Sequence, residues 1–138
     1  MKVLTIPKPA KKINWKKRLW RIFSEYIRRR DNGKCFTCST QKDWKEVDAG
    51  HYVNAGSSPP PLYFDERNVH AQCDSCNRKK SGNKVIYALR LQEIYGSGIL
   101  EELEIMRNRG GKWSDWTYKI KVDEYKEKLK QLTHQEAV

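Results

Sequence analysis

Apolar side chains recur at helical spacing near the start of the chain. In the stretch NWKKRLWRIFSEYIRRR, the apolar positions follow the i, i+3, i+4, i+7, i+8 pattern of one helical stripe. These positions are Leu19, Ile22, Phe23, Tyr26 and Ile27. The segment DNGK that follows contains Asn32 and Gly33, residue types that commonly end helices. The pattern therefore predicts a helix over residues 14–30.

Further along, the apolar runs become short and turn residues become frequent. Residues 34–53 predict a turn and two short strands around KEVDAGHYV. The stretch NAGSSPPPLYF predicts a loop, because three consecutive prolines supply no amide hydrogen to a helix or to a strand ladder. A helix is expected from about residue 74 through SCNRKKS, with more helix from 83 to 95.

Two more helices are expected in the last third of the chain, at ILEELEIMRN and from Ser114, a suitable N-cap, to about Leu132. Apolar residues in the last helix are spaced four, three, four and three apart, which is a seam that suits packing against another helix. The seam consists of Tyr118, Val122, Tyr125, Leu129 and Leu132. Its partner is either the helix around 99–106 of the same chain or a second copy of the chain.

The length of 138 residues fits one domain with tails. We expect a basic flexible tail over 1–13, a central domain over 14–97 and a C-terminal helical extension over 98–138. The net charge of +11 is concentrated at the front, where residues 1–34 hold 12 Lys/Arg and 2 Asp/Glu. This balance points to a polyanionic partner. On the first helix, phosphate contact is preferred over a merely solvated face for Arg18, Arg21, Arg28 and Arg29.

The sequence carries no sign of export or membrane insertion. The opening MKVLTIPKPAKK has a four-residue apolar run before Pro7, and no later segment approaches the length of a membrane span. We therefore expect a cytoplasmic protein. Because disulfides are rare in that reducing compartment, we interpret the four cysteines as metal ligands or as buried thiols.

Two Cys-x-x-Cys pairs, Cys35/Cys38 and Cys73/Cys76, carry the strongest chemical signal. Each pair has the spacing of a zinc knuckle, and the two together complete the tetrahedral sulfur shell that structural zinc prefers. Four reduced core thiols are the alternative, whereas a redox pair does not fit, because no thioredoxin-like pattern surrounds either pair. Four thiolates leave no open position on the zinc ion, so catalysis would need other residues.

Between and just after these pairs, His51, Asn68 and Asn77 form an ordered His, Asn, Asn series. The series resembles the HNH, or ββα-metal, nuclease motif. More closely, the segments FSEYIRRRD, CFTC, DAGHYV and DERNVHAQCDSCNRKKSGN resemble the NinG, or Rap, family of phage recombination endonucleases. The resemblance implies an α+β fold, in which a small ββα-metal (HNH) core is stabilised by the four-cysteine zinc site and flanked by N- and C-terminal helices.

The resemblance also implies roles for individual residues. His51 would be the general base, a task that suits imidazole near neutral pH, and Asn68 would orient it. Asn77 would bind a single catalytic Mg²⁺ or Mn²⁺. The HNH pattern usually has an aspartate ligand before the histidine, where this chain has Gly50. Asp48 is the nearest carboxylate, and a bulge at Gly50 would bring it to the same face as His51.

Other polar residues near this series have two interpretations each. His70 is either a rival ligand of the catalytic metal or a structural histidine beside the zinc knuckle. The basic cluster after Asn77 is assigned to the DNA backbone in preference to a solvated face, and it comprises Arg78, Lys79, Lys80 and Lys84. Contacts to phosphates position a duplex without reading its bases, so no sequence preference is expected.

Two functions remain open at this point. The first is a metal-dependent endonuclease that hydrolyses phosphodiester bonds in branched or Holliday-junction DNA during phage recombination, in the cytoplasm of the bacterial host. The second is a catalytically inert, zinc-stabilised DNA-binding module, because Gly50 has removed a metal ligand. For the first function we expect a homodimer, since resolving a four-way junction needs two symmetric cuts.

Overall fold

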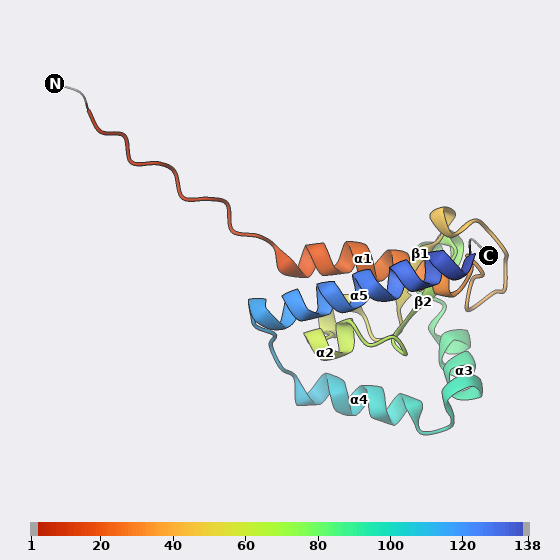
Figure 1. Cartoon of the computed structure of the whole chain (residues 1–138). Coiled ribbons are helices and arrows are strands. Elements are labelled where there is room, and N and C mark those ends of the chain that lie inside the picture. Colours follow the sequence, from red (N-terminus) through yellow and green to blue (C-terminus); the bar gives the residue numbers. More distant parts are fainter. Residues whose placement is uncertain (1–2, 137–138) are drawn as a thin grey trace.

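A two-stranded antiparallel sheet lies between two helical layers (Figure 1). The computed structural model describes residues 3–136. Strand β1 (Asp48–His51) pairs with β2 (Val69–Gln72) in an unbroken register that sets Asp48 opposite Gln72 and His51 opposite Val69. Because side chains alternate between the two faces of a sheet, His51 and Val69 lie on one face, while Asp48, Gly50 and Gln72 lie on the other.

Helices α1 (Trp15–Arg30) and α5 (Asp115–Glu136) lie side by side and form the layer on the His51 face (Figure 1). The Asn14 side chain accepts a hydrogen bond from the Lys17 amide at 3.0 Å and caps α1. Ser114 Oγ accepts one from the Thr117 amide at 3.2 Å in front of α5. The predicted helix over 14–30 and the predicted last helix are both confirmed, although α5 continues beyond Leu132.

The core of this layer joins both helices to the sheet. Its fully or almost fully buried members are Leu19, Phe23, Ile27, Phe64, Val69, Tyr118, Val122 and Tyr125. Three residues of the apolar seam of α5 are therefore buried against α1 of the same chain. The prediction that this seam packs on 99–106 was wrong, because a helical period shows that a face is buried but does not identify its partner. The contribution of α5 to a homodimer stays a prediction.

Helices α3 (Lys84–Tyr95) and α4 (Ile99–Arg109) form the layer on the other side of the sheet (Figure 1). Their buried side chains pack with residues from the cysteine turn and the loop after β1. This second core contains Phe36, Leu62, Tyr87, Leu91, Ile99 and Leu103. The helices predicted in both segments are confirmed.

The proline-rich stretch differs from its prediction. Pro60–Tyr63 forms a single helical turn, α2, with prolines at its first two positions. The amide hydrogens of a first helical turn have no partner inside the helix, so proline costs nothing there. Prolines that were expected to prevent a helix instead start one. A 3₁₀ turn, η2 (Ala55–Ser57), precedes it.

Two further segments are also shorter than expected. Between 34 and 53 there is one strand, β1, preceded by the 3₁₀ turn η1 (Trp44–Glu46), and its partner β2 comes after the proline-rich stretch. The helix expected from residue 74 is one π-helical turn, η3 (Ser75–Lys79). It ends where Ser81, Gly82 and Asn83 all adopt positive φ angles, which a continuing helix cannot accommodate.

The chain is thus a mixed, helix-rich α+β protein with a small sheet. The predicted α+β class is confirmed. Residues 3–13 have no regular secondary structure and extend away from the folded part (Figure 1). Over residues 3–136, none of the helices has both the length and the apolar character needed to cross a membrane.

Candidate functional site

The four cysteines converge beside one end of the sheet. Cys35 and Cys38 lie in the turn after α1, Cys73 directly follows β2, and Cys76 lies in η3. Their Sγ atoms all lie within 4.8 Å of one another, and those of Cys38 and Cys73 are 3.7 Å apart. Four thiolates that bind zinc at about 2.3 Å lie about 3.8 Å from one another. The cluster therefore fits one tetrahedral metal ion.

Polar groups lie beside two sulfur atoms of the cluster. The hydroxyl of Thr37 lies 3.5 Å from the Cys35 sulfur, and that of Thr40 lies 3.1 Å from the Cys38 sulfur. Burial raises the pKa of Cys35, but hydrogen bonds from Thr37 and from nearby amides outweigh burial and lower this pKa to about 6. Burial raises the pKa of Cys73 to about 12, so the surroundings favour the thiolate at Cys35 and not at Cys73. The case for zinc therefore rests on the convergence of the four sulfur atoms, and the thiolate is the form that a metal ion would bind.

His51 ends β1 on the face that α1 covers. Its Nε2 lies 3.0 Å from the carbonyl oxygen of Tyr63. A carbonyl can only accept, so Nε2 carries the proton and Nδ1 carries the lone pair. The ring stacks on Trp20, with centroids 5.1 Å apart. Burial is the main cause that lowers the pKa of His51, to about 4, which keeps the imidazole neutral at pH 7. A neutral imidazole of this kind can accept a proton.

Asn68 is fully buried beside the segments that hold His51. Its Oδ1 accepts a hydrogen bond from the Val53 amide at 2.7 Å, and its Nδ2 donates to the carbonyls of Val53 and Leu62, both at 3.3 Å. The two hydrogen bonds with Val53 fix the chain after His51. The hydrogen bond to Leu62 fixes the α2 turn, which carries the Tyr63 carbonyl. The geometry suits the predicted role, in which Asn68 orients His51 through the backbone of the loop.

Asp48 and Asn77 lie together on the opposite face of the sheet. Asn77 Nδ2 donates a hydrogen bond to Asp48 Oδ2 at 3.1 Å. The bulge predicted at Gly50 was wrong, because the ladder between these two fully described strands is regular. Asp48 and His51 therefore point to different faces, and it is η3 that brings Asn77 beside the carboxylate.

His70, the rival candidate for a ligand of the catalytic metal, is enclosed by aromatic side chains. Its Nδ1 lies 3.1 Å from the Tyr87 hydroxyl, its Nε2 lies 2.9 Å from the Tyr95 hydroxyl, and its ring stacks on Phe36 at 3.9 Å. The Tyr87 hydroxyl in turn donates to the Gly50 carbonyl at 2.7 Å. With both ring nitrogens engaged by tyrosines, His70 fits the structural interpretation rather than that of a metal ligand.

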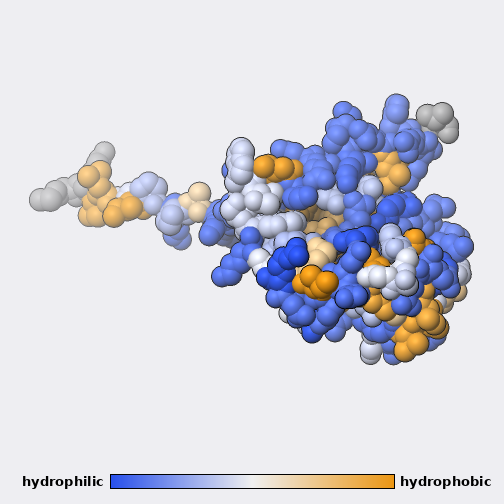
Figure 2. All heavy atoms as spheres, turned by 90° about the horizontal axis from the view of Figure 1, so that it is seen from below, coloured by the Kyte–Doolittle hydropathy of each residue, from blue (hydrophilic) through white to orange (hydrophobic). Residues whose placement is uncertain are grey.

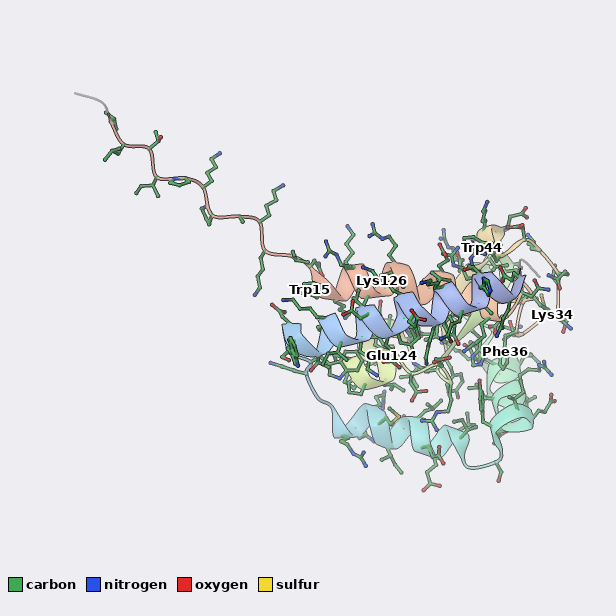
Figure 3. All side chains as sticks on the ribbon, in the orientation of Figure 1. Trp15, Lys34, Phe36, Trp44, Glu124 and Lys126 are labelled. Atoms are coloured by element: carbon green, nitrogen blue, oxygen red, sulfur yellow. The ribbon has the colours of Figure 1, made fainter. Side chains whose placement is uncertain are left out.

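The basic residues of α1 fall into two groups. Arg18 and Arg21 are exposed. Arg28 and Arg29 stack on Trp44, and Arg29 also forms ion pairs with Glu25 and Glu136. Figure 3 shows Trp44 beside the ends of α1 and α5, where these contacts join the two helices. Arg28 and Arg29 are thus engaged in internal contacts, whereas Arg18, which stacks on Trp15, and Arg21 are exposed and accessible to a phosphate.

The cluster after Asn77 divides in the same way. Lys79 and Lys80 are exposed, and Arg78 forms ion pairs with Asp74 at 3.3 Å and with Asp48 at 3.6 Å. Lys84 is half-buried, and its Nζ donates to the carbonyls of His51 and Tyr52. Burial lowers the pKa of Lys84 to about 8. Its structural contact with the end of β1 was not predicted.

Three other contributors to the site were missed from the sequence. The Tyr63 carbonyl and the Trp20 ring hold His51, and the Gln72 side chain reaches toward Gly50. A backbone carbonyl leaves no signal in a sequence, and Trp20 reads as part of an amphipathic helix. The position of Gln72 follows only from the register between β1 and β2, which places it opposite Asp48.

These features define a helix-rich α+β protein with a four-cysteine cluster and a polar site that spans both faces of a small sheet. The model of the family described as Bacteriophage Lambda NinG protein matches residues 5–136. The chain therefore belongs to the NinG family, and the family part of the resemblance is confirmed.

Two relatives illustrate the extent of the similarity. Protein ninG of Salmonella phage P22 is 39% identical over 119 residues, and protein ninG of Escherichia phage lambda is 38% identical over the same length. Each alignment covers 86% of this chain and 57% of the relative, so the chain spans little more than half the length of these proteins. No solved structure matches the chain.

Proposed function

We propose that the protein is a metal-dependent DNA endonuclease of the HNH type, in which β1, β2 and η3 form the ββα-metal core. The observation that carries this proposal is the pairing of Nε2 of His51 with the Tyr63 carbonyl. That contact leaves the proton-accepting nitrogen, Nδ1, on a neutral ring at the end of a strand.

In this proposal, His51 acts as the general base. Its Nδ1 takes a proton from the water that attacks the phosphodiester, and the ring stays aligned because the Tyr63 carbonyl and the Trp20 ring hold it. Asn68 is a positioning residue, since its side chain forms hydrogen bonds with the backbone of Val53, after β1, and of Leu62, in α2. The depressed pKa of His51 keeps the base unprotonated throughout the neutral range.

The catalytic divalent cation would be held by Asp48 and Asn77. Carboxylate and amide oxygens are the hard ligands that Mg²⁺ and Mn²⁺ prefer, and these two side chains already meet on one face of the sheet. When bound, such an ion would supply charge stabilisation at the phosphate. Since Asp48 and His51 lie on opposite faces of the sheet, the proposal requires the phosphate to lie at the end of β1, within reach of both groups. The zinc ion proposed for the four cysteines has a structural role, because its coordination is complete.

Branched DNA is the proposed substrate, and this part rests on the family resemblance alone. The charge distribution supports a nucleic-acid partner, because the exposed Arg18, Arg21, Lys79 and Lys80 add to the basic residues of the N-terminal segment. The second candidate function, an inert DNA-binding module, is favoured by one observation, the absence of a side chain at Gly50.

Substitution of the base separates the two functions. His51→Ala is expected to lower the rate of cleavage of a four-way junction by at least about 100-fold, while the affinity for the junction stays unchanged. A matched control is His134→Ala, which removes an exposed histidine from the end of α5. If purified His51→Ala cleaves like wild type, the base lies elsewhere and the proposed mechanism fails.

A further inference from the structure

Gly50 occupies the position where the HNH pattern usually carries a metal ligand, and the space next to it is not empty. A β-carbon added to Gly50 would lie 1.9 Å from Oε1 of Gln72 and 3.0 Å from Oδ1 of Asn77. The Gln72 side chain therefore reaches from β2 into the volume that a side chain at position 50 would fill. It ends there in an oxygen atom.

The orientation of the Gln72 amide is fixed by its other end. Nε2 donates to the carbonyl of Gly82 at 2.9 Å and to the hydroxyl of Thr37 at 3.2 Å. Since a carbonyl can only accept, the nitrogen must face Gly82 and the oxygen must face Gly50. Gln72 is fully buried, and its Oε1 has no hydrogen-bond partner among the described residues. A buried, unpartnered oxygen of this kind calls for a ligand.

Asn77 is oriented by the same reasoning. Its Nδ2 faces the carboxylate of Asp48, which can only accept, so its Oδ1 points toward Gly50 and Gln72. The amide oxygens of Gln72 and Asn77 thus both border Gly50, and the Asp48 carboxylate lies beside Asn77. Neutral and charged oxygens in such a combination are typical ligands of divalent cations.

We propose that Oε1 of Gln72 is a ligand of the catalytic divalent cation and replaces, from the neighbouring strand, the side chain that Gly50 lacks. This inference rests on the proposed endonuclease function. It also explains why position 50 is a glycine, because any β-carbon there would displace the Gln72 oxygen. The alternative is that Gln72 is only a core amide, whose oxygen rests against the Cα hydrogen of Gly50.

The first test measures Mn²⁺ binding rather than cleavage. Calorimetric titration of Mn²⁺ into zinc-loaded Gln72→Leu protein is expected to show an affinity lower than wild type by about tenfold or more. Gln131→Leu is the matched control, because it makes the same substitution at an exposed glutamine of α5. Its Mn²⁺ affinity is expected to equal that of wild type. Wild-type Mn²⁺ affinity in Gln72→Leu would overturn the inference.

A second variant keeps the inference testable if Gln72→Leu does not fold. Gly50 has an ordinary backbone conformation, so an aspartate is compatible with the backbone at this position. Gly50→Asp alone is expected to bind Mn²⁺ poorly, because its side chain collides with Gln72. Adding Gln72→Ala makes room, and the double variant is expected to regain Mn²⁺ affinity. A double variant that binds Mn²⁺ no better than Gly50→Asp would contradict the inference.

The endonuclease function and the role of Gln72 are tested by different measurements. Mn²⁺-dependent cleavage by the wild-type protein tests the endonuclease activity, whereas the Mn²⁺ affinities of the variants test Gln72. Cleavage by wild type together with unchanged Mn²⁺ binding in Gln72→Leu would retain the endonuclease and reject the ligand. Mn²⁺ binding without cleavage would reject the endonuclease and leave the ligand assignment standing.

Discussion

Glu66 links the C-terminal helix to the loop that enters β2. Its carboxylate accepts hydrogen bonds from the Tyr125 hydroxyl and from Lys128 Nζ, both at 2.9 Å, and lies 3.6 Å from Arg30. Burial raises the pKa of Glu66, but the hydrogen bonds from Lys128 and Tyr125 outweigh it, so the net shift is downward. The folded state therefore favours the ionised carboxylate.

The stability supplied by this group depends on pH with a definite sign. A carboxylate whose pKa is lower in the folded state contributes stability above its unfolded pKa and loses it as the pH falls through the folded value. Glu66→Gln is expected to destabilise the protein by roughly 1 to 2 kcal/mol at pH 7, since the group is partly exposed. In denaturant titrations, the difference from wild type should shrink as the pH falls below about 4.5. An equal difference at all pH values would contradict this account.

Residue types in a motif could be predicted from the sequence, but their contacts could not. His51, Asn68 and Asn77 were assigned from their order along the chain, and their roles stay predictions. The structure adds their contacts with Tyr63, Val53 and Asp48, respectively. Lys84 was assigned to DNA from its charge alone, yet it holds the end of β1. The place of Gln72 needs the strand register, which no local pattern in the sequence specifies.

At the scale of elements, the cysteine cluster joins parts that are far apart in the sequence. One pair follows α1, and the other spans the end of β2 and η3, which also carries Asn77. A metal ion bound here would fix η3 relative to the sheet. The candidate catalytic metal site therefore depends on the cluster for its geometry.

Removal of the metal tests this dependence. Cys73→Ser, or treatment of the wild type with a strong chelator, is expected to lower the melting temperature and to abolish DNA cleavage, because metal binding and folding are coupled. Elemental analysis should find one zinc per wild-type chain and less in the variant. A preparation without zinc, or a variant that melts like wild type, would show that the cluster is four core thiols.

The helices were predictable because each carries its own period of apolar residues. The α1 stripe and the seam of α5 both appear in the sequence, and both are buried as the patterns indicate. The sequence did not indicate that α1 and α5 contact each other, since neither apolar stripe specifies its partner. The α2 turn was missed because prolines normally end helices, and only their position in a first turn allows them.

At the scale of the whole molecule, the surface is mainly hydrophilic but carries an apolar area on one side. Figure 2 shows this area on the face seen from below, where the layer of α3 and α4 lies. Val85 and Leu89 of α3 are 76% and 52% exposed. Tyr118, Val122 and Tyr125 of the α5 seam are buried against α1, so these three residues are not available to a homodimer interface.

The homodimer itself stays a prediction, with an interface that must lie outside Tyr118, Val122 and Tyr125. Two active sites that cut opposite arms of a four-way junction still require two-fold symmetry. Light scattering of the full-length protein with junction DNA is expected to give two chains for each junction. A truncated chain that ends at Lys112 cannot serve as a monomeric control. Without α5, it would expose Leu19, Phe23 and Ile27 of α1. One chain per junction at saturation would exclude the dimer.

We propose that this NinG-family protein is a metal-dependent endonuclease. The most direct test is the incubation of zinc-loaded wild-type protein with end-labelled four-way junction, forked and linear DNA, with Mg²⁺, with Mn²⁺ or with neither. We expect the protein to cleave strands of the branched substrates, and we expect this cleavage to require the divalent cation. Binding of the junction without any cleavage under either cation would contradict the account and would identify the protein as a DNA-binding module.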